Sequence, residues 1–144
     1  MPSDLFLKAA NTGHRALLRL SFGRLGWSAA KMPVLELTTV GRRSGQPRSV
    51  MLTSPFQEGD TLVIVASRGG DPHHPAWFLN LVEHAEVQVE LRDQPRHTRI
   101  ARVAAPEERA RIWPQITERY RNYAGYQRKT DREIPVVLLE IPDA

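Results

Sequence analysis

The sequence contains no cysteine among its 144 residues. This absence excludes disulfide bonds, a thiol nucleophile and a thiolate metal site, so redox chemistry would need a bound cofactor. No run approaches the roughly 18 uninterrupted apolar residues that a membrane-spanning helix requires, and the N-terminus lacks the pattern of a cleaved signal peptide. We therefore expect a protein that is neither integral to a membrane nor exported, and a cytoplasmic location.

Several catalytic motifs are missing as well. The chain has neither a GxGxxG dinucleotide-binding turn nor a GxSxG nucleophile elbow. The adjacent histidines His73 and His74 have no acidic or cysteine partner at a recognised ligand spacing, and neighbouring side chains rarely bind one ion. We accordingly predict no metal site, and we interpret Glu107 and Glu108 as charges at a helix start rather than as a catalytic pair.

Positive charge is concentrated in the first third of the chain. Residues 1–48 contain eight Lys or Arg and two acidic residues, a balance of +6, whereas residues 49–144 contain twelve against fourteen, a balance of −2. Asp4 can cap a basic amphipathic helix over about residues 5–22, which either packs on the domain or contacts the inner face of an anionic membrane peripherally. A nucleic-acid or anionic-lipid binding module is thus an alternative function, but the chain lacks a spaced aromatic platform for bases, and we expect no nucleic-acid partner.

Hydrophobic periodicity predicts six short strands and three helices. The strands are expected at about 34–40, 49–54, 61–67, 86–91, 95–104 and 136–141, and the helices at about 5–22, 76–84 and 106–120. Most strands are joined by short turns and no βαβ rhythm is present, so a mainly antiparallel α+β fold is predicted, a small barrel with peripheral helices. We expect one domain over residues 1–144, with the helix and a connector at 1–32 and the barrel at 33–142.

The most informative stretch is GRRSGQPR, residues 41–48, between the first two predicted strands. Its glycines permit a tight turn, and its three arginines, Arg42, Arg43 and Arg48, each carry a planar cation that can bind phosphate or carboxylate oxygens by two parallel hydrogen bonds. Ser44 adds a hydroxyl donor. The turn is therefore a candidate anion site, and the alternative is a solvated basic loop that protects a strand edge.

A second candidate site is SRGGDPHHPAWFLN, residues 67–80, a loop followed by a short helix. Backbone amides around Gly69 and Gly70 can approach a ligand closely, Arg68 can pair with an anion, and Trp77 offers an aromatic wall for a flat ring. The alternative is that Trp77 and the following phenylalanine are core residues of an amphipathic helix.

The third feature is the grouping of all three tyrosines, Tyr120, Tyr123 and Tyr126, at a spacing of three. On a helix this spacing makes a stripe whose hydroxyls line one side of a cleft, where a phenol can donate a proton or a hydrogen bond to an acceptor oxygen. The alternative is aromatic packing, with Gly125 breaking the helix between the tyrosines.

Together the three stretches resemble the deazaflavin-dependent nitroreductase family, whose members have a split β-barrel fold and bind coenzyme F420, an 8-hydroxy-5-deazaflavin. TTVGRRSGQPR is similar to the family's TT-x-GR-K/R-SG-x-PR signature, and ASRGGDPHHPAWFLNL is similar to its AS-x-GG-x-x-x-HP-x-W-x-x-NL signature. WPQITERYRNYAGYQRKTDREIPVV resembles its C-terminal tyrosine segment, so the likeness covers about residues 33–142. It implies a six-stranded split β-barrel.

The resemblance also implies the site residues. The cofactor's phosphate and side chain would be held by Arg42, Arg43, Ser44 and Arg48, with Ser49, Val50, Met51, Leu52 and Thr53 running along it. The deazaflavin ring would be enclosed by Val65, Ala66, Ser67, Arg68, Ala76, Trp77, Phe78, Leu79 and Asn80, and Tyr123 would contact the cofactor or the substrate. Met51 stands where proline is common in the family, Thr53 where some members have tyrosine, and Arg43 and Arg68 where lysine is frequent.

The implied function is an oxidoreductase that passes hydride from reduced coenzyme F420 to an electron-poor small molecule such as a quinone or a nitro compound. Tyr120, Tyr123 or Tyr126 would orient the acceptor or supply a proton. The alternatives are an FMN-dependent oxidoreductase on the same barrel, and a deazaflavin carrier without turnover of its own. The sequence leaves the natural acceptor and the oligomeric state open.

Overall fold

The computed structural model describes residues 32–142. Its elements are β1 (Val34–Val40), β2 (Pro47–Thr53), β3 (Phe56–Glu58), β4 (Thr61–Val65), the 3-10 turn η2 (Arg68–Gly70), α2 (Ala76–Glu83), β5 (Glu86–Leu91), β6 (Gln94–Val103), α3 (Pro106–Arg119), α4 (Asn122–Arg128) and β7 (Val136–Glu140). The predicted amphipathic helix at 5–22, and with it the predicted membrane contact, lies outside the described residues. No helix in the described part is long and apolar enough to cross a membrane.

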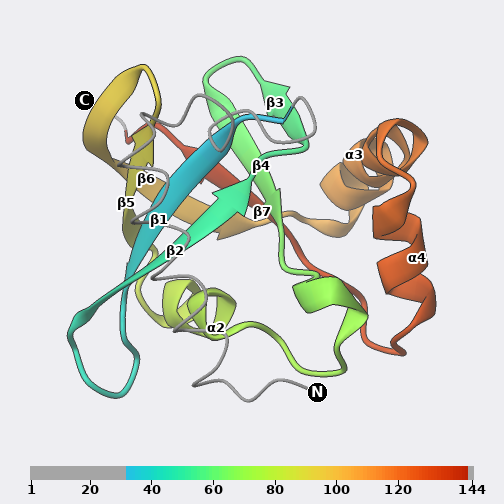
Figure 1. Cartoon of the computed structure of the whole chain (residues 1–144), viewed down its shortest axis with the longest axis horizontal. Coiled ribbons are helices and arrows are strands. Elements are labelled where there is room, and N and C mark those ends of the chain that lie inside the picture. Colours follow the sequence, from blue (N-terminus) through green and yellow to red (C-terminus); the bar gives the residue numbers. More distant parts are fainter. Residues whose placement is uncertain (1–31, 143–144) are drawn as a thin grey trace.

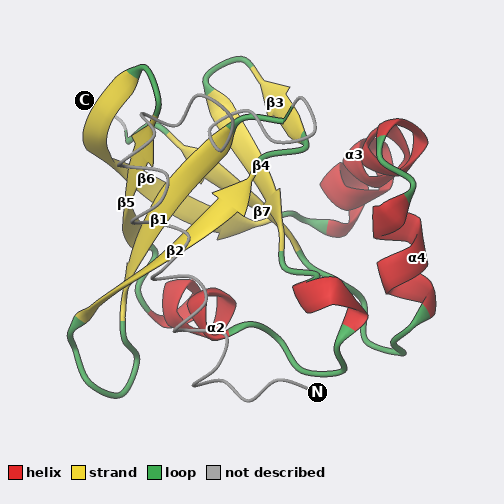
Figure 2. Ribbon diagram, viewed as in Figure 1, coloured by secondary structure: helices red, strands yellow, loops and turns green. Residues whose placement is uncertain are grey.

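All strands belong to one antiparallel sheet in the order β2-β1-β5-β6-β7-β4-β3. The sheet curls into a half-barrel, with α2 at one open end and α3 and α4 side by side beyond β4 and β7 (Figures 1 and 2). The prediction of an antiparallel barrel with peripheral helices is confirmed. The prediction of six strands is wrong, because Phe56–Glu58 forms a seventh strand that pairs with β4.

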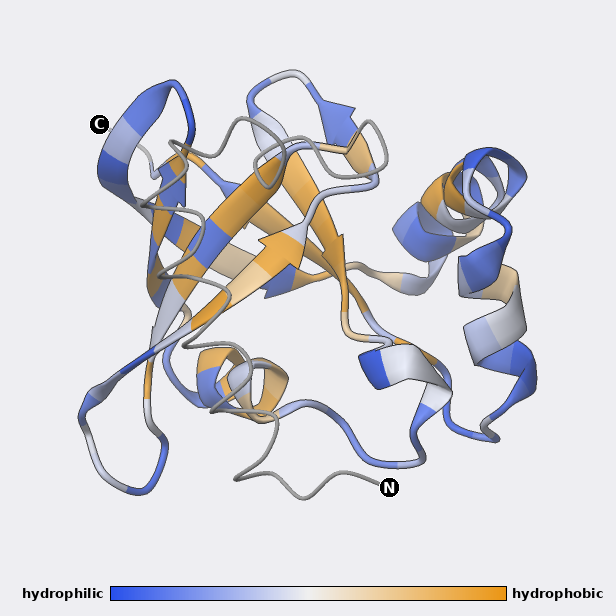
Figure 3. Cartoon of the chain, viewed as in Figure 1, coloured by the Kyte–Doolittle hydropathy of each residue, from blue (hydrophilic) through white to orange (hydrophobic). Residues whose placement is uncertain are grey.

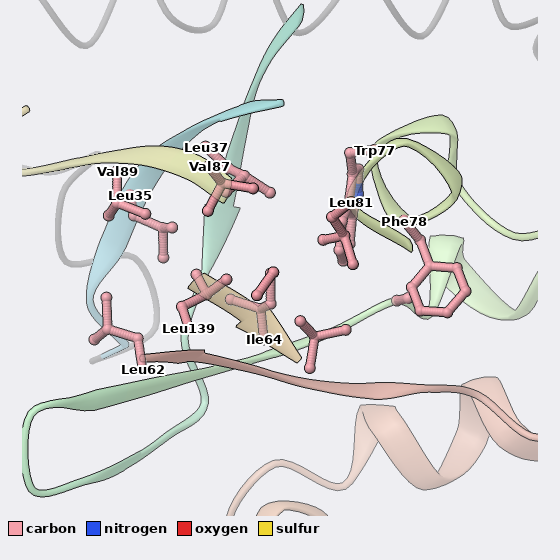
Figure 4. Packing of buried hydrophobic residues seen from close by; sticks show 13 residues of the cluster. Leu35, Leu37, Leu62, Ile64, Trp77, Phe78, Leu81, Val87, Val89 and Leu139 are labelled. Carbon is pink, nitrogen blue, oxygen red and sulfur yellow. The ribbon is translucent and has the colours of Figure 1, made fainter. Parts of the chain in front are cut away.

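One apolar core fills the inside of the half-barrel. Inward-facing side chains of β1, β4, β5 and β7 meet there, and α2 contributes Trp77, Phe78 and Leu81 from the open end (Figure 4). The alternation of β5 accounts for the two valines that it contributes, since Val87 and Val89 are buried while Glu86 and Gln88 lie on the opposite face. Figure 3 shows the same division, with apolar residues on the strands and polar ones on the loop between β1 and β2.

A second apolar core lies between the outer face of the sheet and the two C-terminal helices. Val63 and Val65 of β4 and Leu138 of β7 pack there against Ile112 and Ile116 of α3. The alternate residues of the same strands point into the barrel core. β4 and β7 are therefore buried on both faces, which explains why their sequences are continuous apolar runs instead of alternating ones.

The start of α3 is fixed to the sheet by Glu108. Its carboxylate accepts the Ala105 backbone N–H at 2.9 Å, which satisfies one free donor of the helix start. It also accepts two hydrogen bonds from Arg102 of β6, at 2.6 and 2.9 Å. The Arg102 hydrogen bonds, followed by the Ala105 hydrogen bond, lower the pKa of Glu108 from 4.5 to about 2.

A Glu108→Gln substitution should therefore change the acid stability of the protein. The folded state lowers the pKa of Glu108, so its stabilisation is complete above pH 4.5 and is lost as pH falls toward 2. We expect Glu108→Gln to lower the free energy of unfolding by about 1 kcal/mol at pH 7 and by much less near pH 2, measured by urea unfolding. Glu107→Gln, on an exposed neighbouring side chain, is the control. A constant difference between Glu108→Gln and wild type across this pH range would contradict the assignment.

Candidate functional site

The arginine turn between β1 and β2 has a closed backbone. The Gly41 N–H donates to the Gln46 carbonyl and the Gly45 N–H donates to the Gly41 carbonyl, both at 2.8 Å. Gly45 has a φ of 71°, a left-handed conformation that suits glycine. The Ser44 hydroxyl accepts from the Gln46 N–H at 3.1 Å and from Arg48 Nη2 at 3.3 Å. Ser44 thus restrains the Arg48 side chain next to the turn.

The cations of this turn have no acidic partner among residues 32–142. Arg43 and Arg48 are exposed and Arg42 is half-buried. No carboxylate within residues 32–142 lies at ion-pair distance from any of the three. Their charge is therefore available to an external anion, which is the property that an anion site requires.

Asn80 joins the arginine turn to α2. Its Oδ1 accepts from the Arg42 backbone N–H at 3.1 Å and from Arg42 Nη1 at 3.3 Å. Its Nδ2 donates to the Thr39 hydroxyl at 3.1 Å. Asn80 is only 4% exposed, so these bonds are shielded from water. The two stretches that sequence analysis singled out separately are adjacent, on the same end of the half-barrel (Figure 1).

The five residues that follow the turn, predicted to run along the cofactor, divide between the two faces of β2. Val50 and Leu52 pack against the barrel core. Met51 packs against Val34 on the other face. The Ser49 and Thr38 hydroxyls are 2.8 Å apart. The alternation of a strand accounts for this division, and it means that one ligand cannot contact all five side chains from a single face.

The loop that follows β4, residues 66–74, begins with a left-handed turn. Arg68, Gly69 and Gly70 have φ angles of 47°, 65° and 86°. A Cβ added at Gly70 would lie 2.7 Å from the Tyr126 carbonyl oxygen, so this glycine lets the loop touch α4. The Gly70 N–H, expected to face a ligand, instead donates to the Ser67 carbonyl at 2.9 Å.

Arg132, which precedes β7, holds this loop from outside and was not recognised in the sequence. Its guanidinium donates to the carbonyls of Ala66 at 3.1 Å, Ser67 at 2.9 Å and Asp71 at 2.9 Å. It also lies 3.1 Å from His74 Nδ1. A lone arginine whose partners are backbone carbonyls about 60 positions away gives no signal in a sequence pattern.

The two adjacent histidines have separate partners. His73 is exposed and its Nδ1 lies 3.1 Å from Asp71 Oδ1. His74 is half-buried, packs against Phe78 with ring centroids 4.8 Å apart and the ring planes tilted by 41°, and faces Arg132. Within the described residues, no group of three acidic or histidine side chains is placed to hold a metal ion.

The predicted aromatic wall is largely inside the protein. Trp77 and Phe78 are 9% and 8% exposed and belong to the barrel core. Ala76 is exposed and Leu79 half-buried, so these are the accessible side chains of the predicted α2 set. Val65 and Ala66 at the end of β4 are buried as well, in the outer and inner cores respectively.

The three tyrosines form a continuous stripe. Successive rings meet edge to face, with centroids 6.5 Å apart for Tyr120 and Tyr123 and 5.8 Å apart for Tyr123 and Tyr126. The alternative in which Gly125 breaks the helix is wrong, because α4 runs through Gly125; α3 ends at Arg119, so the break lies between Tyr120 and the start of α4.

Only two of the three tyrosines are accessible. Tyr120 and Tyr126 are half-buried. Tyr123 is 7% exposed, and its hydroxyl lies 3.9 Å from Met32 Sδ. Burial raises the pKa of Tyr123, and a hydrogen bond with Thr53 opposes the rise. The Tyr123 phenol therefore stays protonated at neutral pH and acts first as a core side chain that supports its neighbours.

Replacing Asn80 should weaken both the fold and the arginine turn. We expect Asn80→Ala to lower the free energy of unfolding by about 2 kcal/mol in urea, since it removes buried hydrogen bonds and leaves the Arg42 N–H without its acceptor. Hydrogen exchange at the Arg42 amide should accelerate. Asn122→Ala, at an exposed position on α4, is the control. Unchanged exchange at Arg42 in Asn80→Ala would mean that Asn80 does not organise the turn.

Known proteins similar to this chain identify its family. The family model described as F420H(2)-dependent quinone reductase matches residues 12–141. A Mycobacterium tuberculosis protein named F420H(2)-dependent quinone reductase is 38% identical over 130 residues, which is 88% of this chain and 86% of the relative.

Solved structures support the fold. An F420-H2 dependent reductase, FDR-A, superposes with a TM-score of 0.66 at 41% identity, over 75% of this chain and 94% of its own. The haem storage protein HutZ of Vibrio cholerae, 13% identical with a TM-score of 0.53 over 77% of this chain and 82% of its own, shares the fold alone. The family match and the identity to the mycobacterial reductase confirm the expected resemblance: the chain belongs to the F420H(2)-dependent quinone reductase family, which has an FMN-binding-like split-barrel fold.

Proposed function

We propose that this chain oxidises reduced coenzyme F420 and reduces a quinone, the activity for which its family and its mycobacterial relative are named. The observation that carries the proposal is the junction at Asn80. This residue binds Arg42 and Thr39, and so holds the arginine turn beside the helix and loop expected to receive a flat ring. One ligand with a ring and an anionic tail can reach both parts.

The anionic part of the coenzyme fits the turn between β1 and β2. A phosphodiester and a carboxylate tail need several cations, and Arg42, Arg43 and Arg48 offer them without competition from a described carboxylate. Asn80 fixes Arg42 and Ser44 restrains Arg48, so both guanidinium groups are oriented before the ligand arrives.

The ring is proposed to lie against the loop after β4 and the exposed side of α2. Ser67 and Arg68 line this loop, while Ala76 and Leu79 are the accessible side chains of α2. Trp77 and Phe78 support this surface from the barrel core and keep it rigid. When bound, the reduced coenzyme supplies the hydride, and the protein's part is to position the two reactants and stabilise charge.

The acceptor is proposed to bind on the α4 side. Tyr126 is half-buried, and its backbone carbonyl lies beside Gly70 of the left-handed turn, so α4 meets the loop of the proposed ring surface at this residue. We assign Tyr126, with Tyr120 at the other end of the stripe, to orient the quinone and to donate a hydrogen bond or proton to its oxygen. The Tyr123 ring contacts the rings of Tyr120 and Tyr126 edge to face and supports both.

The decisive experiment is a side-by-side titration of the purified protein with coenzyme F420 and FMN, followed by turnover of the reduced coenzyme with menadione. Tight binding of the deazaflavin, weak binding of FMN and loss of the reduced coenzyme's absorbance only when quinone is present are expected. Preferential FMN binding would favour an FMN-dependent oxidoreductase. Deazaflavin binding without quinone turnover would favour a carrier.

The arginine turn can be tested with a matched double substitution. Each arginine that binds a phosphate contributes about 1.5 to 3 kcal/mol, so Arg42→Ala with Arg48→Ala should raise the Kd for the coenzyme at least a hundredfold. The control is Arg92→Ala with Arg96→Ala, which removes the same charge from exposed positions at the β5–β6 hairpin. This hairpin lies beside the first residues of β1, at the end away from the arginine turn. Equal affinity in the two double variants would remove the anion-site assignment.

The roles proposed for Tyr126 and Tyr123 predict an effect on turnover for one substitution and on stability for the other. We expect Tyr126→Phe to lower kcat with menadione at least tenfold with little change in coenzyme Kd or in Tm, because it removes a hydroxyl proposed to act on the acceptor. Tyr123→Phe should instead lower Tm, because its buried hydroxyl loses the contact with Thr53. The reverse pattern would identify Tyr123 as the residue that acts on the acceptor.

A further inference from the structure

The 66–74 loop is fixed by one side chain from a distant part of the chain. The Arg132 guanidinium reaches carbonyls near both ends of the loop, at Ala66 and Ser67 and at Asp71. Between these points lie Arg68, Gly69 and Gly70 with their positive φ angles. A non-glycine residue in this conformation persists only where its surroundings enforce it, and the Arg132 bonds supply that enforcement.

The fourth partner of Arg132 is a side chain that can change its charge. Arg132 Nη1 lies 3.1 Å from His74 Nδ1. Guanidinium nitrogens only donate hydrogen bonds, so His74 must present an unprotonated Nδ1. When His74 is protonated, both ring nitrogens carry hydrogen, and two donors and two positive charges then face each other at this contact.

The charged groups around His74 do not compensate for that clash. The Asp71 carboxylate is engaged by the His73 N–H at 2.8 Å and lies 3.8 Å from Arg68. The remaining ring contact of His74 is with Phe78, which is apolar. Protonation of His74 is therefore opposed at the place where the loop is held.

We propose that Arg132 is a positioning residue for coenzyme binding, and that it holds the 66–74 loop in its binding conformation only while His74 is neutral. The inference rests on the proposed function, since it takes this loop to be part of the coenzyme surface. Coenzyme affinity then falls on acidification through a contact that touches neither the coenzyme nor the quinone.

The direction of the pH effect follows from the environment of His74. Burial, and then the positive charge of Arg132, lower the pKa of His74 below its usual 6.5. The stabilisation from the neutral form is therefore complete above pH 6.5 and is lost as pH falls through the lower pKa of the folded state. The bond is intact at pH 7.5 and weakens toward pH 4.5.

The test compares wild type with His74→Asn and Arg132→Lys in the full chain, at pH values from 4.5 to 7.5. The Asn side chain places an oxygen that accepts hydrogen bonds at every pH near the position of Nδ1. Wild type should lose about tenfold in coenzyme F420 affinity between pH 7.5 and 4.5 relative to His74→Asn, whose profile should be flatter. Arg132→Lys, which keeps the charge but not the planar fork, should bind about tenfold more weakly than wild type at pH 7.5.

A second measurement needs no coenzyme. The Gly70 and Asp71 amides donate within the turn, so their hydrogen exchange, corrected for the intrinsic rate at each pH, reports its conformation. Protection should fall with pH in wild type, remain in His74→Asn and be reduced at every pH in Arg132→Lys. His84→Gln, at an exposed histidine after α2, is the control and should follow wild type.

The outcomes separate the two proposals. A pH profile of His74→Asn identical to that of wild type, in affinity and in exchange, would overturn the role of His74. Unchanged affinity and exchange in Arg132→Lys would overturn the role of Arg132. If wild type does not bind the coenzyme, the proposed function fails, while the exchange experiment still decides whether Arg132 and His74 control the loop.

Discussion

The double-sided burial of β4 and β7 is the constraint on which the rest of the molecule depends. These strands pack inward against the barrel core and outward against α3 and α4, so they join two apolar cores into one unit. The loop after β4 and the segment that carries Arg132 leave this shared wall at the same end, and Val65 pairs directly with Val136. The 66–74 loop of the candidate site therefore stands on strands that are buried on both faces, and this support fixes the position of the loop.

Two polar side chains at the site, Asn80 and Arg132, hold neighbouring segments of the protein in place by hydrogen bonds. Asn80 aligns the turn of Arg42, and Arg132 binds the carbonyls of the neighbouring loop. Both connect segments that are distant in sequence, and both satisfy polar groups that would otherwise be buried without partners. The exposed guanidinium groups of the arginine turn stay available to a ligand, because Asn80 and Arg132 make the hydrogen bonds that hold these segments in place. It also suits a family in which the coenzyme brings the reactivity and the protein brings the geometry.

Much of the fold could be predicted because its signals are local. The alternation of β5 and the continuous apolar runs of β4 and β7 report directly which faces are buried. β3 was not predicted because it has three residues, reads as part of a turn and exists only through its pairing with β4. The end of the predicted helix at about residue 120 agrees with α3, but α4 was not predicted, and the alternative in which Gly125 breaks a helix is wrong because α4 runs through this glycine.

The site was less accessible to sequence reasoning than the fold. The arginine turn and the tyrosine group are visible as composition, but the contact between Arg42 and Asn80 spans 38 positions and the bonds of Arg132 span more than 60. Gly70 makes another contact between distant parts of this chain. No larger side chain fits between it and the backbone of α4. A side chain at this position would push α4 away from the 66–74 loop, and under the proposed function it would widen the space assigned to the acceptor.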